Sequence, residues 1–125
     1  MYEYKIKRGS IRVVDGDTIH CTINLGFNIL HNATIRLAGI NCPETRTRDK
    51  IEKELGIKAK NRLKELIKGK DVEIQTVKQS RGKFGRILGV LVVDDVSLNR
   101  QLINEGHAVE YTGGKRRPIS PDILP

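Results

Sequence analysis

The sequence predicts a mainly β fold of the α+β class. Short runs in which apolar and polar residues alternate recur along the chain, and this period of two is typical of strands with one buried face. One long stretch, residues 53–68, instead has its apolar residues at helical spacing. At 125 residues, 38% of them apolar, the chain is expected to form one domain with a modest core.

The first forty residues are expected to form an edge strand followed by a three-stranded meander. The edge strand covers residues 2–6, and the meander strands begin at Ile11, Ile19 and Thr34. Asp15-Gly16 between the first two meander strands favours a type I′ hairpin turn. Residues 26–32 have flanking polar residues and are interpreted as a connection.

The second half of the chain is expected to add two helices and two more strands. The charged residues 44–52 predict a loop, and the first helix should run from Lys53 to Gly69. Strands are expected over residues 72–77 and 87–93, and Ser97 can cap a short C-terminal helix. The three meander strands and these two strands, with the helix between the third and fourth, give the element order of a five-stranded OB-fold barrel. Residues 1–112 should form this domain, and residues 113–125 a flexible basic tail.

Charge and composition point to a polyanionic partner. The net charge is +8, and residues 51–93 contain eleven Lys and Arg against five Asp and Glu. This balance suggests DNA or RNA, although a surface of solvated lysines is the plain alternative. No apolar run is long enough to span a bilayer, so we expect no membrane association, and we expect the protein to act as a monomer.

The cysteines and the N-terminus predict a cytoplasmic protein. Cys21 and Cys42 lack the paired spacing of a zinc site and are expected to be reduced thiols. A catalytic role for Cys42 is the alternative, but the three histidines show no pattern that pairs one of them with it. The N-terminal residues lack the apolar core of a signal peptide, with a removed leader as the alternative explanation.

Three charged positions stand where phosphate chemistry could use them. Arg36 lies inside an apolar strand, where a charge is costly unless it meets an anion; its alternative is a stem on the core with the head in solvent. Arg86 begins another apolar strand, or is simply a charge beside a turn. Glu44 follows Pro43 on a loop, as a candidate general base or as an ordinary surface carboxylate.

Two carboxylates add a candidate site for a cation. Asp15 and Asp17 lie two residues apart at a tight turn, and hard cations such as Ca2+ take several oxygen ligands. The alternative is a plain hairpin turn, because Asp-Gly is favoured there without any metal.

Four short motifs in a fixed order carry a resemblance to a known family. They are Asp15-Gly16-Asp17-Thr18, Ile35-Arg36-Leu37, Pro43-Glu44-Thr45 and Lys83-Phe84-Gly85-Arg86. With them the chain resembles the staphylococcal nuclease (thermonuclease) family over about residues 10–112. It looks closest to the small phage-type or prokaryotic members, with a long hairpin at residues 22–34. The resemblance implies an OB-fold and a Ca2+-dependent phosphodiesterase of low sequence specificity that leaves 3′-phosphate ends on DNA or RNA.

The resemblance also implies roles for individual residues. Arg36 and Arg86 would hold the scissile phosphate, and Glu44 would activate or orient the attacking water. Asp17 would bind one Ca2+, with Asp15 beside it and the backbone carbonyl of Cys42 as a further ligand. Lys83, Phe84 and Tyr111 would bind the nucleotide, with Phe84 offering a stacking face.

One departure from the family pattern leaves two functions open. Asn41 stands where the family usually has an aspartate ligand, and an amide oxygen can bind Ca2+ but brings no charge. Asp49 in the charged loop could compensate. The first hypothesis is therefore an active metal-dependent nuclease. The alternative is an OB-fold module that binds nucleic acid with weak or lost catalysis.

Overall fold

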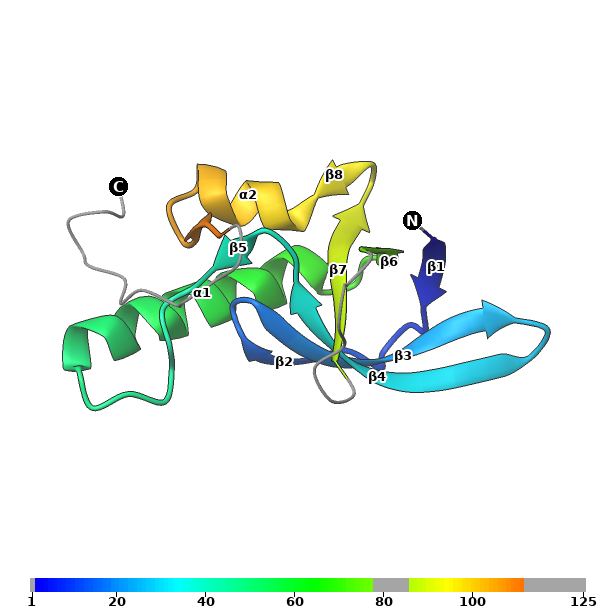
Figure 1. Cartoon of the computed structure of the whole chain (residues 1–125), viewed down its shortest axis with the longest axis horizontal. Helices are drawn as coiled ribbons and strands as arrows, with labels where there is room; N and C mark the ends of the chain where they lie inside the picture. The colour runs from blue at the N-terminus through cyan, green and yellow to red at the C-terminus, as the bar shows by residue number, and fades with distance from the viewer. Residues whose placement is uncertain (1, 78–85, 112–125) are drawn as a thin grey trace.

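The computed structural model describes residues 2–77 and 86–111, which form a strand-rich body with two helices (Figure 1). In chain order the elements are β1 (Glu3–Ile6), β2 (Arg12–Asp15), β3 (Thr18–Gly26), β4 (Ile29–Leu37), β5 (Ile40–Asn41), α1 (Lys50–Ile67), β6 (Glu73–Thr76), β7 (Arg86–Val93), β8 (Val96–Ser97), α2 (Leu98–Asn104) and β9 (Val109–Glu110).

Five strands close into the expected barrel. Neighbouring strands pair in the order β1-β6-β7-β4-β3, and β1 also pairs with β3, which completes the ring. β2 extends the sheet along the same edge of β3, and β4 and β7 run parallel while the other main pairs are antiparallel. The α+β fold with a helix after the meander is therefore confirmed.

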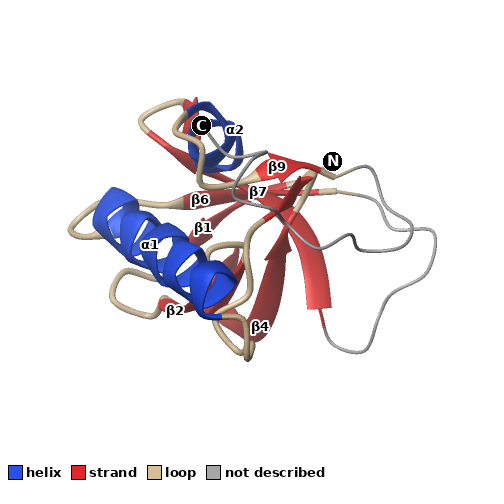
Figure 2. Cartoon of the chain, turned by 90° about the vertical axis from the view of Figure 1, so that its left-hand side faces the viewer, coloured by secondary structure: helices blue, strands red, loops and turns tan. Residues whose placement is uncertain are grey.

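The core fills the barrel and continues under both helices. Alternate residues of the strands point inward and are almost fully buried, among them Ile19, Ile35 and Leu91. α1 adds Ala59 and Leu63, and α2 adds Leu102, from their inward faces. Figure 2 shows α1 lying along one side of the strands and α2 above them.

The connection expected at residues 26–32 is a strand instead. β3 and β4 continue beyond the barrel as a long two-stranded hairpin whose turn contains Phe27 and Asn28, both with positive φ (Figure 1). Its residues 24–32 are exposed, so no alternation between core and solvent marks them in the sequence. Cross-strand pairing with β3 holds this segment, and such pairing cannot be recognised in one strand alone.

The first helix begins three residues before the expected start. Asp49 is its N-cap, and the Asp49 carboxylate accepts hydrogen bonds from the backbone N–H groups of Ile51 and Glu52. The second helix agrees with the sequence: Ser97 caps its N-terminus and Gly106 follows its end with a positive φ. In residues 2–77 and 86–111, neither helix combines the length and hydrophobicity needed to cross a lipid bilayer. The proposed tail, residues 113–125, lies outside the described residues.

Candidate active site

The guanidinium group of Arg36 lies near the C-terminal end of β4 and is held from several sides. Its Nη1 donates to the backbone carbonyls of Leu37 at 2.9 Å and Asp17 at 3.5 Å. Its Nη2 lies 3.6 Å from Oδ2 of Asp17 and donates to Oδ1 of Asn41 at 3.4 Å. The Arg36 side chain is only 18% exposed. The Arg36 head therefore has an anionic partner within the protein and is mostly withdrawn from solvent.

The Asp17 carboxylate connects the hairpin turn between β2 and β3 to the rest of the site. Asp17 is 3% exposed, and a buried carboxylate needs compensating partners. Its Oδ2 accepts a hydrogen bond from the backbone N–H of Cys42 at 2.9 Å, and its Oδ1 accepts one from the Thr18 hydroxyl at 3.1 Å. Asp17 therefore contacts both Arg36 and the loop that follows β5.

The loop of residues 42–45 is fixed at both ends to the same hairpin turn. At its start, Cys42 donates to the Asp17 carboxylate, and at its end the Thr45 hydroxyl donates to Oδ1 of Asp15. Glu44 lies between these two anchors and is half-buried. Its backbone position is thus set by the two carboxylates of the Asp-Gly-Asp motif.

Helix α1 supports this loop from behind. The backbone N–H of Glu44 donates to Oε1 of Glu52 in the first turn of the helix, at 3.3 Å. A Cβ added at Gly56 would lie 2.6 Å from the carbonyl oxygen of Glu44, closer than side chains pack. The glycine therefore allows the helix to touch the loop backbone directly.

The turn between β2 and β3 differs from the expected type I′ turn. Such a turn needs positive φ at both central residues, but neither Gly16 nor Asp17 has one. Glycine is required here for space, because a Cβ at Gly16 would lie 2.8 Å from Cβ of Ala59 and 2.9 Å from Sγ of Cys42. The hairpin itself is as predicted.

Strand register brings Arg86 to the face that carries Arg36. β4 and β7 are parallel neighbours in which Thr34 pairs with Arg86 and Arg36 pairs with Leu88. Paired residues of adjacent strands lie on one face of a sheet, and residues two apart share a face. Arg36 and Arg86 thus occupy the same outer face, opposite the buried Ile35. Arg86 itself is exposed at the start of its strand.

Tyr111 lies beside Arg36. The Arg36 Cζ atom is 6.0 Å from the centre of the Tyr111 ring, within the range of a cation–π contact. The backbone N–H of Tyr111 donates to the Gly39 carbonyl at 2.9 Å, next to the pairing of β5 with β9. The other two candidate substrate-binding residues, Lys83 and Phe84, lie outside the described residues.

The candidate metal ligands form an oxygen-only set with one well-placed carboxylate. Oδ2 of Asp17 and Oδ1 of Asn41 both approach the same Arg36 nitrogen, so they converge on a point where positive charge already sits. The Asp15 carboxylate accepts a hydrogen bond from the Thr45 hydroxyl, and the Asp49 carboxylate caps α1. Across the described ranges, no three His, Cys, Asp or Glu side chains cluster as metal ligands.

Both cysteines are free thiols, and both are buried. Burial raises the pKa of Cys21 to about 11, which keeps its thiol protonated at neutral pH. Cys42 is fully buried, with its Sγ packed close to Gly16. A thiol without access to solvent is poorly suited to attack a polymeric substrate.

Asn99 is a supporting residue that sequence reasoning did not identify as part of the site. It is 4% exposed in α2, its Oδ1 accepts from the Leu91 N–H, and its Nδ2 donates to the carbonyls of Ala38 and Gly89. It thereby joins α2, β7 and the turn that leads to Asn41. A lone asparagine in the first turn of an apolar helix face is a sequence signal for such a role.

Comparison with known proteins identifies one family and several relatives. The family model described as staphylococcal nuclease homologue matches residues 34–122. Three similar proteins come from Bacillus subtilis (strain 168). The SPbeta prophage-derived endonuclease YokF is 35% identical over 98 residues, 78% of this chain and 31% of its own length. Endonuclease YncB is 31% identical over 101 residues, 78% and 44% of the two chains, and endonuclease YhcR is 31% identical over 107 residues, 80% and 8%.

The chain therefore spans less than half the length of each of these relatives. The similarity covers the strands and loops that carry Arg36, Glu44 and Arg86. By the family match over most of its length, the chain belongs to the staphylococcal nuclease homologue family.

Proposed function

We propose that this protein is a phosphodiesterase that hydrolyses DNA, RNA or both with low sequence specificity. One observation carries the proposal: the Arg36 guanidinium, the Asp17 carboxylate and the loop of Glu44 form one hydrogen-bonded cluster. Phosphoryl transfer depends mainly on positioning and on stabilising negative charge, and this cluster offers both. Three relatives of this chain are named endonucleases.

In this proposal Arg36 and Arg86 hold the scissile phosphate from one face of the sheet. Guanidinium groups bind phosphate oxygens through paired N–H donors. Carbonyl oxygens of Leu37 and Asp17 already orient the Arg36 head, so little reorganisation is needed when an anion arrives. Glu44, on the anchored loop, would take the proton of the attacking water. Cleavage of the bond to the 5′ oxygen would leave 3′-phosphate ends.

In this proposal the oxygen atoms around Asp17 would hold one Ca2+ ion. Asp17 and Asn41 supply side-chain oxygens, the Cys42 carbonyl can supply a backbone oxygen, and Asp15 lies on the same turn. Ca2+ takes 6–8 oxygen ligands, so water and substrate phosphate would complete the shell. With Asn41 in place of a carboxylate, the set carries less charge and should bind the ion weakly. When bound, a divalent ion polarises the phosphoryl oxygens and stabilises their charge.

The direct test is cleavage of single-stranded and duplex DNA and of RNA by purified protein, with Ca2+ and with chelator. We expect cleavage with Ca2+ only. The 3′ ends produced should block primer extension until phosphatase treatment removes the phosphate. A folded sample that cleaves no substrate in any divalent ion would rule out the nuclease, and ends that extend without phosphatase would rule out the proposed product.

A second function has one observation in its favour. Asn41 is 3% exposed and its Oδ1 is bonded to Arg36, so the position contributes an oxygen without negative charge. If this lowers metal affinity too far, the protein is an OB-fold module that binds nucleic acid without turnover. That function predicts binding that weakens steeply with salt and no cleavage at any metal concentration.

A further inference from the structure

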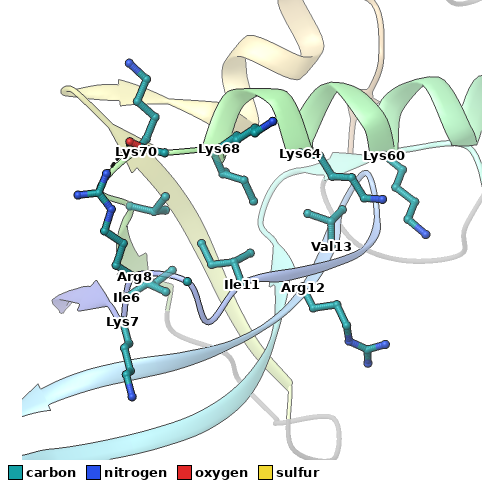
Figure 3. A pocket seen from close by; sticks show the side chains of 14 residues that line it. Ile6, Lys7, Arg8, Ile11, Arg12, Val13, Lys60, Lys64, Lys68 and Lys70 are labelled. Carbon is teal, nitrogen blue, oxygen red and sulfur yellow. Dashed lines mark hydrogen bonds between the residues drawn. The ribbon is translucent and has the colours of Figure 1, made fainter.

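A basic cleft lies away from the candidate active site, between the C-terminal half of α1 and the segment that joins β1 to β2. Its volume is about 590 Å³. Lysine and arginine side chains line it from both sides: Lys7, Arg8, Arg12, Lys60, Lys64, Lys68 and Lys70. Figure 3 shows Lys60 and Lys64 extending from the helix toward the side on which Arg12 lies.

The cleft has a floor and a charge balance suited to a ligand with apolar faces and negative charges. Ile6, Ile11 and Val13 form part of its apolar surface. Two of its cations have carboxylate partners: Arg8 lies 3.5 Å from Asp71 and Lys70 lies 4.0 Å from Asp94.

The remaining cations in the cleft have no carboxylate within 4.0 Å among the residues that the structure describes; they are Lys7, Arg12, Lys60, Lys64 and Lys68. Like charges gathered in one concave surface repel one another, and a polyanion relieves that repulsion.

Arg12 connects this cleft to the candidate active site. It also lines a second, open hollow on the outer face of β2, β3 and β4, together with His20 and Thr34. Register places Arg12 beside His20, His20 beside Thr34, and Thr34 beside Arg86. The hydrogen bond of 2.8 Å between His20 Nδ1 and Thr34 Oγ1 joins the middle of this row.

The row crosses four neighbouring strands on one face of the sheet. Strands lie about 4.8 Å apart, so Arg12 and Arg86 are separated by roughly 14 Å along it. Arg86 is the candidate phosphate ligand at one end, and the cleft opens at the other end. His20 and Thr34 supply the polar side chains of the row between them.

We propose that the cleft is a second nucleic-acid site, which holds the single strand flanking the scissile phosphate. The strand leaves the candidate active site, crosses the row from Arg86 to Arg12, and enters the cleft between Lys60, Lys64 and the β1–β2 segment. The cations accept phosphates, as the positively charged grooves of single-strand binding proteins do, and the aliphatic floor can contact sugars and bases. The path of the strand from the active site to the cleft rests on the proposed function, whereas binding of a strand in the cleft does not.

The test compares two pairs of lysines. Lys60→Ala/Lys64→Ala removes two charges from the cleft, and Lys5→Ala/Lys58→Ala removes two exposed charges outside it. Binding of labelled single-stranded DNA of about 6 and about 20 nucleotides is measured by fluorescence anisotropy in chelator, where no cleavage occurs. Wild type and the control pair should bind the longer strand more tightly than the shorter one.

The cleft variant should lose about tenfold in affinity for the longer strand and so lose most of the gain with length. Its salt slope should fall by about 1.4, because each lost phosphate contact on single strands is worth about 0.7. Arg12→Ala changes the opposite wall of the cleft and should also reduce the gain in affinity with strand length. This second variant keeps the test valid if the lysine variant misfolds.

Three outcomes would overturn the proposal. They are an unchanged length dependence in the cleft variants, an equal loss in the control pair, or a loss of binding to phosphatidylserine vesicles with oligonucleotide binding intact. Because all readouts are binding without metal, a failed nuclease assay leaves this test valid.

Discussion

Gly56 of α1 packs directly against the backbone carbonyl of Glu44, the candidate general base. A Cβ at Gly56 would lie 2.6 Å from the Glu44 carbonyl oxygen and 2.8 Å from that of Pro43. Backbone atoms at both positions leave no flexible side chain that could move aside. The helix therefore contacts the loop backbone at Gly56, where no side chain can be added.

Gly56→Ala is expected to displace the Glu44 loop. Alanine favours a helix over glycine by about 1 kcal/mol, so the helix itself should not be weakened. The overlap must move the loop, and a displacement of about 1 Å at a reacting group can cost about 100-fold in rate. We expect a large fall in kcat of DNA cleavage with a folded circular dichroism spectrum. Asn61→Ala, at an exposed position of the same helix, is the control. Wild-type kcat in Gly56→Ala would contradict the close packing.

Glu44→Gln is expected to separate catalysis from binding. The amide keeps the shape of the side chain but cannot take a proton from water, a role worth about 10²–10⁴-fold in rate. We expect kcat to fall by that factor while oligonucleotide affinity changes little. Glu54→Gln, exposed on α1, is the matched control. Equal losses of rate and affinity in Glu44→Gln would mean that Glu44 has a structural role only.

Asn41→Asp is expected to strengthen Ca2+ binding. It places a second carboxylate beside Asp17, and affinity of such sites rises with the charge of the ligand set. Isothermal titration should show a Kd for Ca2+ lowered by about tenfold or more, since about 1.4 kcal/mol of added attraction is tenfold. Asn104→Asp, exposed at the end of α2, controls for net charge.

The same variant also discriminates between the two candidate functions. Cleavage that appears only in Asn41→Asp would favour the binding-module function for the natural chain. An unchanged Kd would show that Asn41 is not a ligand.

Asn99→Ala should lower stability more than any exposed substitution on α2. It removes the partner of the Leu91 N–H and of two carbonyls in a buried setting. Leaving buried polar groups without partners costs about 1–3 kcal/mol each, so we expect the free energy of unfolding to fall by about 2–4 kcal/mol. Urea denaturation measures it, with Asn104→Ala as the control. A smaller loss of unfolding free energy in Asn99→Ala than in the control would show that Asn99 does not support the fold in this way.

The ion pair between Arg62 of α1 and Glu105, the C-cap of α2, predicts a pH dependence of stability. The hydrogen bond from Arg62 lowers the pKa of Glu105 to about 2, from an ordinary value of 4.5. A carboxyl with a lowered folded pKa stabilises the fold above its unfolded pKa and loses this contribution as pH falls from about 4.5 to about 2. Both side chains are partly exposed, so salt screens the effect.

Glu105→Gln should therefore lower Tm by a few degrees at pH 7 and have little effect near pH 2. Thermal unfolding followed at several pH values measures this difference. For Glu54→Gln, the Tm difference from wild type should not depend on pH in this way. A Tm difference between wild type and Glu105→Gln that persists at the lowest pH would contradict the assigned linkage.

Local features of the sequence predicted many elements because their causes are local. The alternation of β3, the apolar run of β7 and the cap at Ser97 are each determined by residues within one element. The start of α1 was placed wrongly, and the residue pattern alone missed the hairpin of residues 24–32, which the family resemblance implied. Side-chain capping by Asp49 extends the helix into the charged loop, and pairing between two exposed strands leaves no buried face to detect.

The sequence by itself determined which groups are available for the site: Asp17, Arg36, Asn41 and Glu44 are recognisable from their motifs and their unusual contexts. Only the tertiary structure decided how they meet. The Asp17–Arg36 contact joins residues 19 apart, and the parallel register of β4 and β7 selects the face that Arg86 shares with Arg36. Strand register and helix packing depend on contacts between distant segments, so no short stretch of sequence specifies them. Such contacts also decided that Gly16 and Gly56 are needed for space.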